Sequence, residues 1–183
     1  MEKLFVNLIK LNRDKIDSSR YPFNIKCLQN FNEMKIDNPV TLFYGENGVG
    51  KSTLVEAIAI ALGMNPEGGS NNMQFSNYDD YSDLYKYLTI GKFSVPKTKF
   101  FLRAESFYNV ATNISNNVGP TGNLSDQYGG DLHECSHGES FLNLVKNRFT
   151  PNGLYILDEP EAALSPERQL SLLYLINQLS ERL

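Results

Sequence analysis

A glycine-rich segment that ends in lysine, serine and threonine restricts the possible folds of this 183-residue chain more than any other feature. The segment reads Gly45-Glu-Asn-Gly-Val-Gly-Lys51-Ser52-Thr53 and matches the pattern G-x-x-x-x-G-K-[ST] at every fixed position. Its glycines allow the backbone to curl until successive N–H groups point at one anion. The segment therefore predicts a phosphate-binding loop (P-loop), which requires a buried strand before it and a helix after it.

The flanking residues agree with that requirement. Pro39 to Tyr44 form a short apolar run, typical of a buried strand that enters a turn. Lys51 to Leu62 follow with helical periodicity, and Gly63 is placed to end the helix in a left-handed conformation. The apolar face predicted for this helix consists of Leu54, Val55, Ile58 and Leu62.

The residue types in the loop suit the binding of a nucleoside triphosphate. Lys51 would reach the β- and γ-phosphates, Ser52 would ligate Mg²⁺, and Thr53 would support the α-phosphate. The start of the following helix would add the positive end of its dipole to the same site. The predicted ATP-binding residues are Gly45, Glu46, Asn47, Gly48, Val49, Gly50, Lys51, Ser52 and Thr53.

Two adjacent carboxylates, Asp158 and Glu159, directly follow the apolar run from Leu154 to Leu157. Mg²⁺ prefers oxygen ligands, so Asp158 is predicted to hold the metal's coordination shell through water. Glu159 is predicted to be the general base that polarises the water attacking the γ-phosphate. Taken alone, such a run also describes a strand with a solvated end. The P-loop upstream favours the catalytic interpretation.

Further segments of the chain alternate between strand and helix. Leu4 to Leu8, Ile25 to Ile36 and Lys99 to Arg103 have strand-like patterns. Ser106 to Ala111 and Glu139 to Arg148 have helical ones. This alternation predicts a single α/β domain over residues 1–183, with a mainly parallel central sheet flanked by helices and an antiparallel β portion near the N-terminus.

The last predicted helix has a clear start, with Ser165 as N-cap and Pro166 in the first turn. Its apolar stripe is expected to pack against the sheet. The stripe consists of Leu170, Leu173, Ile176 and Leu179. Two stretches with many small and polar residues, 63–83 and 113–131, are predicted to be surface loops.

The asparagine within the P-loop, the sequence Asp158-Glu159-Pro160 and the tetrapeptide Ser136-His-Gly-Glu139 together resemble an ABC-type ATPase. More narrowly, the chain resembles the small bacterial stand-alone predicted ATPases related to the SMC and RecF type. The resemblance implies a P-loop NTPase fold, Mg²⁺-dependent ATP hydrolysis, and a homodimer that closes on ATP and reopens after hydrolysis. DNA-related or defence processes are the setting that it implies.

The resemblance also assigns a role to the tetrapeptide. In ABC ATPases a signature loop of the form Ser-Gly-Gly-Gln touches the nucleotide of the second subunit, and here Ser136, Gly138 and Glu139 would take that role. His137 and Glu139 depart from the pattern. From the residues alone, Ser136 and Glu139 also form a capping box, and a capped, exposed helix start is itself a phosphate-binding feature. Glu161 to Ser165 resembles the D-loop that lines the dimer seam.

Two weaker resemblances concern the nucleotide's surroundings. Glu105 is the polar residue nearest to the place of the glutamine in the Q-loop. Tyr21 to Phe23 lies ahead of the P-loop, where ABC ATPases often stack adenine on an aromatic ring. A core or turn role for this segment fits the sequence equally well.

Composition restricts the setting more than the partner. The net charge of −4 and the pI near 5.2 do not support nucleic-acid binding, although a local basic patch stays open. No apolar run approaches the roughly 20 residues of a membrane-spanning helix. Cys27 and Cys135 are too few for a disulfide framework. We therefore expect a cytoplasmic protein.

The resemblance implies one more strand after the last helix, ending in a switch histidine, whereas the sequence ends at Leu183. We therefore expect this chain to bind ATP and to hydrolyse it poorly, and ATP binding alone is an alternative function. A transporter's ATPase subunit is a second alternative, disfavoured by the short segment between Arg103 and Ser136. A P-loop kinase is a third, disfavoured by the signature-like loop and by Asp158-Glu159-Pro160.

Overall fold

The computed structural model of the chain describes residues 4–14, 16–66, 68–70, 81–116, 118–119, 122–123 and 136–182. The helices in chain order are α1 Lys26–Gln29, α2 Lys51–Ala61, 3₁₀ helix η1 Asp83–Tyr87, α3 Phe107–Asn116, α4 His137–Arg148, 3₁₀ helix η3 Pro160–Ala163 and α5 Pro166–Ser180. The strands are β1 Val6–Leu11, β2 Glu33–Lys35, β3 Gly69–Ser70, β4 Leu88–Lys92, β5 Thr98–Arg103, β6 Val118–Gly119, β7 Gly122–Asn123 and β8 Gly153–Asp158.

The N-terminal sheet is antiparallel, as expected, and has the order β2-β1-β4. Strand β1 occupies the predicted place at the start of the chain. The prediction of one or two strands between Ile25 and Ile36 is only partly right, because four residues of this stretch form helix α1 and only the last part pairs as β2. Leu28 of α1 is fully buried, so this turn of helix serves to deliver an apolar side chain to the core.

A second sheet has the order β3-β5-β8, and in it β5 and β8 run parallel from Thr98↔Gly153 to Arg103↔Asp158. The short strand β3 pairs antiparallel with β5. The fold is therefore α/β with mixed sheets, and β5–β8 is the one parallel pair among the described strands. A mainly parallel central sheet is not what these residues form.

The predicted buried strand before the P-loop is wrong as a paired element. Residues 39–44 form no regular strand, and three of their apolar side chains are exposed: Val40 at 50%, Leu42 at 85% and Tyr44 at 95%. Phe43 is half-buried and packs against the core shared with α2. A strand requires a hydrogen-bonding neighbour. Within the described part of the chain, residues 39–44 have no strand partner, and β8 is paired only along its β5 edge. The apolar run is present, but the described residues supply no neighbouring strand for it.

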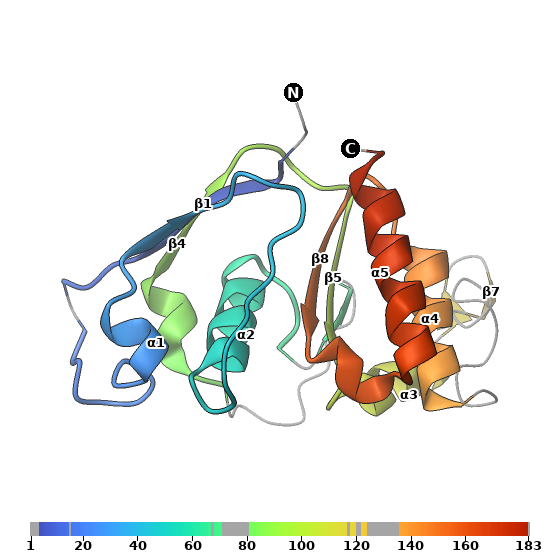
Figure 1. Ribbon diagram of the computed structural model, residues 1–183, viewed down its shortest axis with the longest axis horizontal. Coiled ribbons are helices and arrows are strands. Elements are labelled where there is room, and N and C mark those ends of the chain that lie inside the picture. The colour runs from blue at the N-terminus through green and yellow to red at the C-terminus, as the bar shows by residue number, and fades with distance from the viewer. Residues whose placement is uncertain are drawn as a thin grey trace.

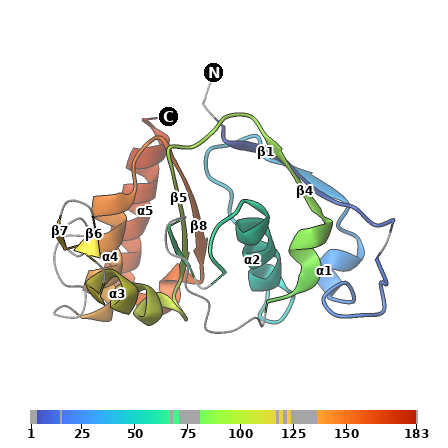
Figure 2. The ribbon, with the colours of Figure 1, turned by 180° about the vertical axis from the view of Figure 1, so that it is seen from behind.

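Strand β5 separates two hydrophobic cores. Phe100 and Leu102 point into a core shared with α3, α4 and α5, whereas Phe101 points into a core shared with β1, α2 and η1. This alternation is what a pleated strand with two covered faces requires. Helices α4 and α5 accordingly lie together on one side of the β5–β8 pair, and α2 lies on the other (Figure 1, Figure 2).

Helices α2, α4 and α5 confirm the sequence patterns at their ends. Helix α2 runs to Ala61, and Gly63 has the predicted left-handed φ of 80°. Helix α5 begins after the N-cap Ser165 with Pro166 in its first turn. Its predicted apolar stripe is half wrong, because Leu170 and Leu173 are exposed. The face that packs on the core consists of Leu172, Leu175, Ile176 and Leu179.

The two predicted surface loops contain more structure than expected. The first stretch, 63–83, includes β3 and the start of η1, and its residues 71–80 lie outside the described part. The second, 113–131, includes the end of α3 and the short hairpin strands β6 and β7, and the rest of it lies outside the described part. Among the described residues, no helix is long and apolar enough to cross a membrane.

Candidate functional site

The backbone of the glycine-rich loop has the curled conformation that the sequence predicts. The φ angles are 156° at Gly45, 79° at Gly48 and 98° at Gly50, values that side-chain-bearing residues rarely adopt. Gly50 is the left-handed N-cap residue of α2, so the loop delivers the chain directly into the start of that helix. Glu46 and Asn47 are exposed at the tip of the loop. The first N–H groups of a helix have no partner within the helix, and a helix start behind a curled glycine-rich loop is an arrangement that can bind anions.

Gly50 is also fixed by close packing. A Cβ atom built at this position would lie 2.4 Å from Cγ2 of Ile25 and 2.9 Å from Sγ of Cys27. Both distances are shorter than real carbon contacts allow. At Gly48, in contrast, an added Cβ atom would have no neighbouring atom within 4 Å. The segment around α1 therefore holds one end of the P-loop and leaves its middle open.

We expect Gly50→Ala to destabilise the domain by about 2–4 kcal/mol, combining left-handed backbone strain with overpacking. Gly48→Ala, which meets only the strain, is the matched control and is expected to cost about 1 kcal/mol. Chemical denaturation of both variants measures the difference. Equal losses at the two positions would show that the contacts with Ile25 and Cys27 do not hold the loop.

Lys51 closes the loop on itself. Its Nζ donates to the carbonyl oxygens of Gly45, at 2.8 Å, and of Glu46, at 2.9 Å. The ammonium group therefore lies against the first two residues of the loop. Ser52 and Thr53 follow in the first turn of α2 and are partly exposed. Lys51 is the one cationic side chain in residues 45–53, so a phosphate chain bound in the loop would contact it.

Asp158 and Glu159 stand at the end of β8, as predicted. Asp158 is the last residue of the strand and is 8% exposed, and Glu159 is exposed. Glu159 has φ 49° and ψ 45°, a left-handed conformation that is unusual for a residue other than glycine. The turn reverses the chain directly into η3, which begins at Pro160. Strained backbone of this kind is found preferentially at functional sites.

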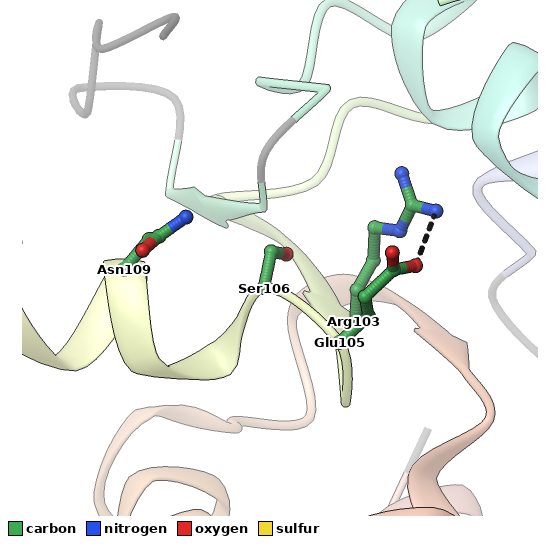
Figure 3. A pocket seen from close by; sticks show the side chains of 4 residues that line it. All are labelled: Arg103, Glu105, Ser106 and Asn109. Atoms are coloured by element: carbon green, nitrogen blue, oxygen red, sulfur yellow. Dashed lines mark hydrogen bonds and ion pairs between the residues drawn. The ribbon is translucent and has the colours of Figure 1, made fainter. Parts of the chain in front are cut away.

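An arginine links the end of β8 to α2. The Nη1 atom of Arg103, at the end of β5, lies 2.5 Å from Oε2 of Glu56, and its Nε lies 3.6 Å from Oδ2 of Asp158. A third carboxylate, that of Glu105, lies 3.4 Å from Nη2. Figure 3 shows Arg103 and Glu105 beside a polar cavity that is also lined by Ser106 and Asn109.

This arrangement brings the P-loop helix and the Asp158 strand into one site. Glu56 follows Ser52 by four residues on α2, so the two side chains lie on the same face of the helix. Because Glu56 reaches Asp158 through Arg103, the face that carries Ser52 is turned toward the end of β8. Burial raises the pKa of Glu56, the Arg103 charge opposes that shift, and the Asp158 charge adds to it.

The segment Ser136–Glu139 forms the N-terminal end of α4, and the predicted capping box is confirmed. The backbone N–H and the hydroxyl of Ser136 both donate to Oε2 of Glu139, at 3.0 and 2.6 Å. These bonds, with Arg168 of α5 at 2.8 Å from Oε1, lower the pKa of the Glu139 carboxyl. Gly138 is buried, and a Cβ atom there would lie 3.0 Å from the carbonyl oxygen of Ala163.

The segment Ser136–Glu139 is therefore held against η3 and α5, the elements that directly follow Asp158 and Glu159. Ser136 itself is exposed at the start of the helix. The side chain of His137 lies outside the described part of the chain.

The two weaker predictions have different outcomes. Phe23 is 7% exposed and packs edge-on against Tyr87, with ring centroids 5.0 Å apart, so it is a core residue. Tyr21 is 66% exposed. The side chain of Glu105 is 85% exposed and contacts Arg103. Its role as a stand-in for the Q-loop glutamine stays a prediction.

Sequence reasoning missed the connecting residues Glu56, Arg103 and Arg168. A signal for Glu56 was available in its spacing of four from Ser52 on a predicted helix. Arg103 closes an apolar strand run as Asp158 does, which would place both at one sheet edge if the two strands were parallel neighbours. The sequence of either strand alone does not show that the two strands are neighbours.

The donor set fits a magnesium–nucleotide complex better than a metal held by protein alone. Among the described residues, no group of three His, Cys, Asp or Glu side chains could hold a metal ion. Mg²⁺ is commonly bound by one or two protein oxygens together with substrate phosphates and water. The Ser52 hydroxyl and the Asp158 carboxylate would be that kind of incomplete set of hard oxygen ligands, and their role as magnesium ligands stays a prediction.

A protein-family model described as an AAA domain matches residues 23–127, which is more than half of the chain and includes the P-loop, α2 and β5. No curated protein and no solved structure matches the chain.

Proposed function

The chain belongs to the AAA domain family, a family of P-loop ATPases, and from this premise we propose that it binds ATP with Mg²⁺ at residues 45–53 and hydrolyses it with Glu159 as general base. The family supports ATP binding and hydrolysis in general. The residue roles and the ABC-type mode of action are our own inference. They are supported by the local geometry described above.

The observation that carries the proposal is the contact between the P-loop helix α2 and the end of strand β8. The curled P-loop ends in Lys51 at the start of α2, and α2 is linked through Glu56 and Arg103 to Asp158 at the end of β8. A triphosphate in the loop would have N–H donors and an ammonium group on one side and a carboxylate for its metal on the other. Such a division of donors and acceptors suits a metal-bound polyphosphate.

Mg²⁺, when bound, would offset the charge of the β- and γ-phosphates. Ser52 and Asp158 are the residues that would hold it, Asp158 through water. Lys51 would move from the carbonyls of Gly45 and Glu46 to the phosphate oxygens. Glu159 would accept a proton from a water whose oxygen bonds to the γ-phosphorus, while the bond from that phosphorus to the β–γ bridging oxygen breaks and ADP leaves.

Titration calorimetry of the purified chain with ATP and Mg²⁺, followed by a phosphate-release assay, tests the proposal directly. We expect saturable binding with one ATP per chain and measurable release of phosphate. GTP and inorganic phosphate serve as comparison ligands. Failure of ATP to bind at millimolar concentration in both the presence and the absence of Mg²⁺ would overturn the proposal.

We further propose that ATP closes two chains into a dimer in the ABC manner. The features in favour are the exposed, capped start of α4 at Ser136 and the packing of Gly138 against η3. Orphan N–H groups at such a helix start can bind the γ-phosphate of a nucleotide held by another copy. Arg168 fixes Glu139 and therefore the orientation of this helix end.

Ser136→Arg tests the dimer. We expect ATP with Mg²⁺ to shift the protein from monomer to dimer in light scattering, and the arginine to block the shift because its side chain fills the space next to the phosphate. Both proteins would carry Glu159→Gln, which suppresses turnover during the measurement. Ser171→Arg, at an exposed position on α5, adds the same side chain and the same charge and is the matched control. One unchanged mass with and without ATP would contradict the dimer.

A further inference from the structure

Arg103 is surrounded by carboxylates that come from three different parts of the chain. Glu56 lies on α2, Asp158 ends β8, and Glu105 lies in the turn after β5. The side chains of Glu56 and Asp158 are only 14% and 10% exposed, and that of Arg103 is 20% exposed. Within this group, two largely buried negative charges therefore depend on one guanidinium group. Removal of that group would leave them uncompensated.

The contacts of Arg103 are unequal. Its tight ion pair is with Glu56, at 2.5 Å, whereas Asp158 lies at 3.6 Å from Nε and makes no hydrogen bond with it. The Nε atom is buried and lacks a hydrogen-bond partner. Arg103 thus supplies charge to Asp158 without occupying the lone pairs of its carboxylate, which stay available for the water shell of a metal.

The cluster lies close to the place of the phosphates. Glu56 is one helical turn, about 6 Å along the axis, from Ser52. The start of α2 and the P-loop lie directly before Ser52. Three carboxylates and one guanidinium leave an excess of two negative charges, the magnitude that one divalent cation neutralises. The negative charges of this cluster would repel a triphosphate that enters the P-loop without a bound metal ion.

We propose that Arg103 is a positioning residue that serves as the resident counter-cation of this cluster, holding Glu56 and Asp158 together in the absence of metal and reducing their repulsion of an incoming nucleotide. The inference rests on the proposed function, because it assumes that ATP binds at residues 45–53. Its consequence concerns how strongly ATP binding depends on Mg²⁺. A purely structural arginine would have no such consequence.

The test compares ATP affinity in EDTA with ATP affinity in Mg²⁺ by calorimetry. For Arg103→Gln we expect about tenfold weaker binding in EDTA, because the cluster gains a net negative charge, and a change of about twofold or less in saturating Mg²⁺. Arg103→Lys keeps the charge and is expected to bind as the wild type does in EDTA. An equal loss in both buffers for Arg103→Gln would show a structural role and overturn the proposal.

The double variant Arg103→Gln/Glu56→Gln removes one positive and one negative charge, so its cluster has the same net charge as that of the wild type. Position 56 then carries no buried carboxylate that has lost its arginine partner. We expect its affinity in EDTA to return to within about threefold of the wild type. This variant keeps the test decisive if Arg103→Gln alone does not fold. A tenfold loss in EDTA that persists in the double variant would contradict the counter-cation role.

Lys99→Gln is the matched control. Lys99 lies on the same strand as Arg103 and also contacts the α2 region, but its Nζ donates to the carbonyl of Leu62 at the C-terminal end of the helix, at 2.7 Å. Removal of this charge is expected to leave the ratio of the two affinities unchanged. If the wild type binds ATP in neither buffer, the proposed function fails. If the wild type binds and the ratio does not respond to Arg103→Gln, only the present inference fails.

Discussion

Replacement of Glu159 by glutamine is expected to leave ATP binding intact and to slow turnover by about 10²–10⁴-fold, the usual contribution of a positioned general base. The amide keeps the shape of the side chain and loses the proton acceptor. The backbone supports this role, since Glu159 has a left-handed φ of 49° between Asp158 and Pro160. Phosphate release at saturating ATP, with binding measured separately by calorimetry, separates the two effects.

Two companion variants sharpen this test. Glu167→Gln removes an exposed carboxylate from the first turn of α5 and is expected to keep wild-type turnover. Glu159→Gly is expected to be as inactive as the glutamine variant and more thermostable than it, because glycine adopts positive φ without the roughly 1–2 kcal/mol cost of a side chain. Wild-type turnover by Glu159→Gln would show that another group accepts the proton.

The parts of the site that the sequence predicted are those coded by local pattern. The P-loop needs glycines at fixed positions, and φ angles of 156° at Gly45 and 98° at Gly50 are the reason. The ends of α2 and α5 follow from a left-handed glycine and from a serine–proline start. Each of these signals acts within a few residues, so a single segment contains all the information needed.

The errors concern partners that are distant along the chain. The apolar run of residues 39–44 predicts a strand correctly only if a neighbouring strand is available, and the described residues provide none. On α5 the predicted stripe included Leu170 and Leu173, whereas Leu172 and Leu175 pack on the core shared with α4 instead. The Glu56–Arg103–Asp158 link likewise arises only when β5 and β8 pair in parallel register.

Replacement of Lys51 by alanine is expected to weaken ATP binding by about a hundredfold or more, because the triphosphate loses its principal cation. Charge-assisted hydrogen bonds contribute about 1.5–3 kcal/mol each, and the ammonium group can make more than one of them with phosphate oxygens. In the structure the same group donates to the carbonyl oxygens of Gly45 and Glu46. Binding must therefore exchange these neutral acceptors for charged ones, and the exchange favours the phosphate.

The loss of the two carbonyl contacts could also loosen the loop, so the measurement must separate affinity from folding. Thermal unfolding with and without ATP and Mg²⁺ does this. The unfolding temperature without ligand measures the stability lost with the loop contacts, and the rise in unfolding temperature on addition of ligand measures ATP affinity. At a hundred times the dissociation constant, bound ATP stabilises the wild type by about 2.7 kcal/mol, and we expect the rise to be largely lost in Lys51→Ala. Lys92→Ala, which removes an exposed lysine at the end of β4, is the charge control. An equal ATP-induced rise in the wild type and in Lys51→Ala would mean that nucleotide, if bound at all, lies outside the P-loop.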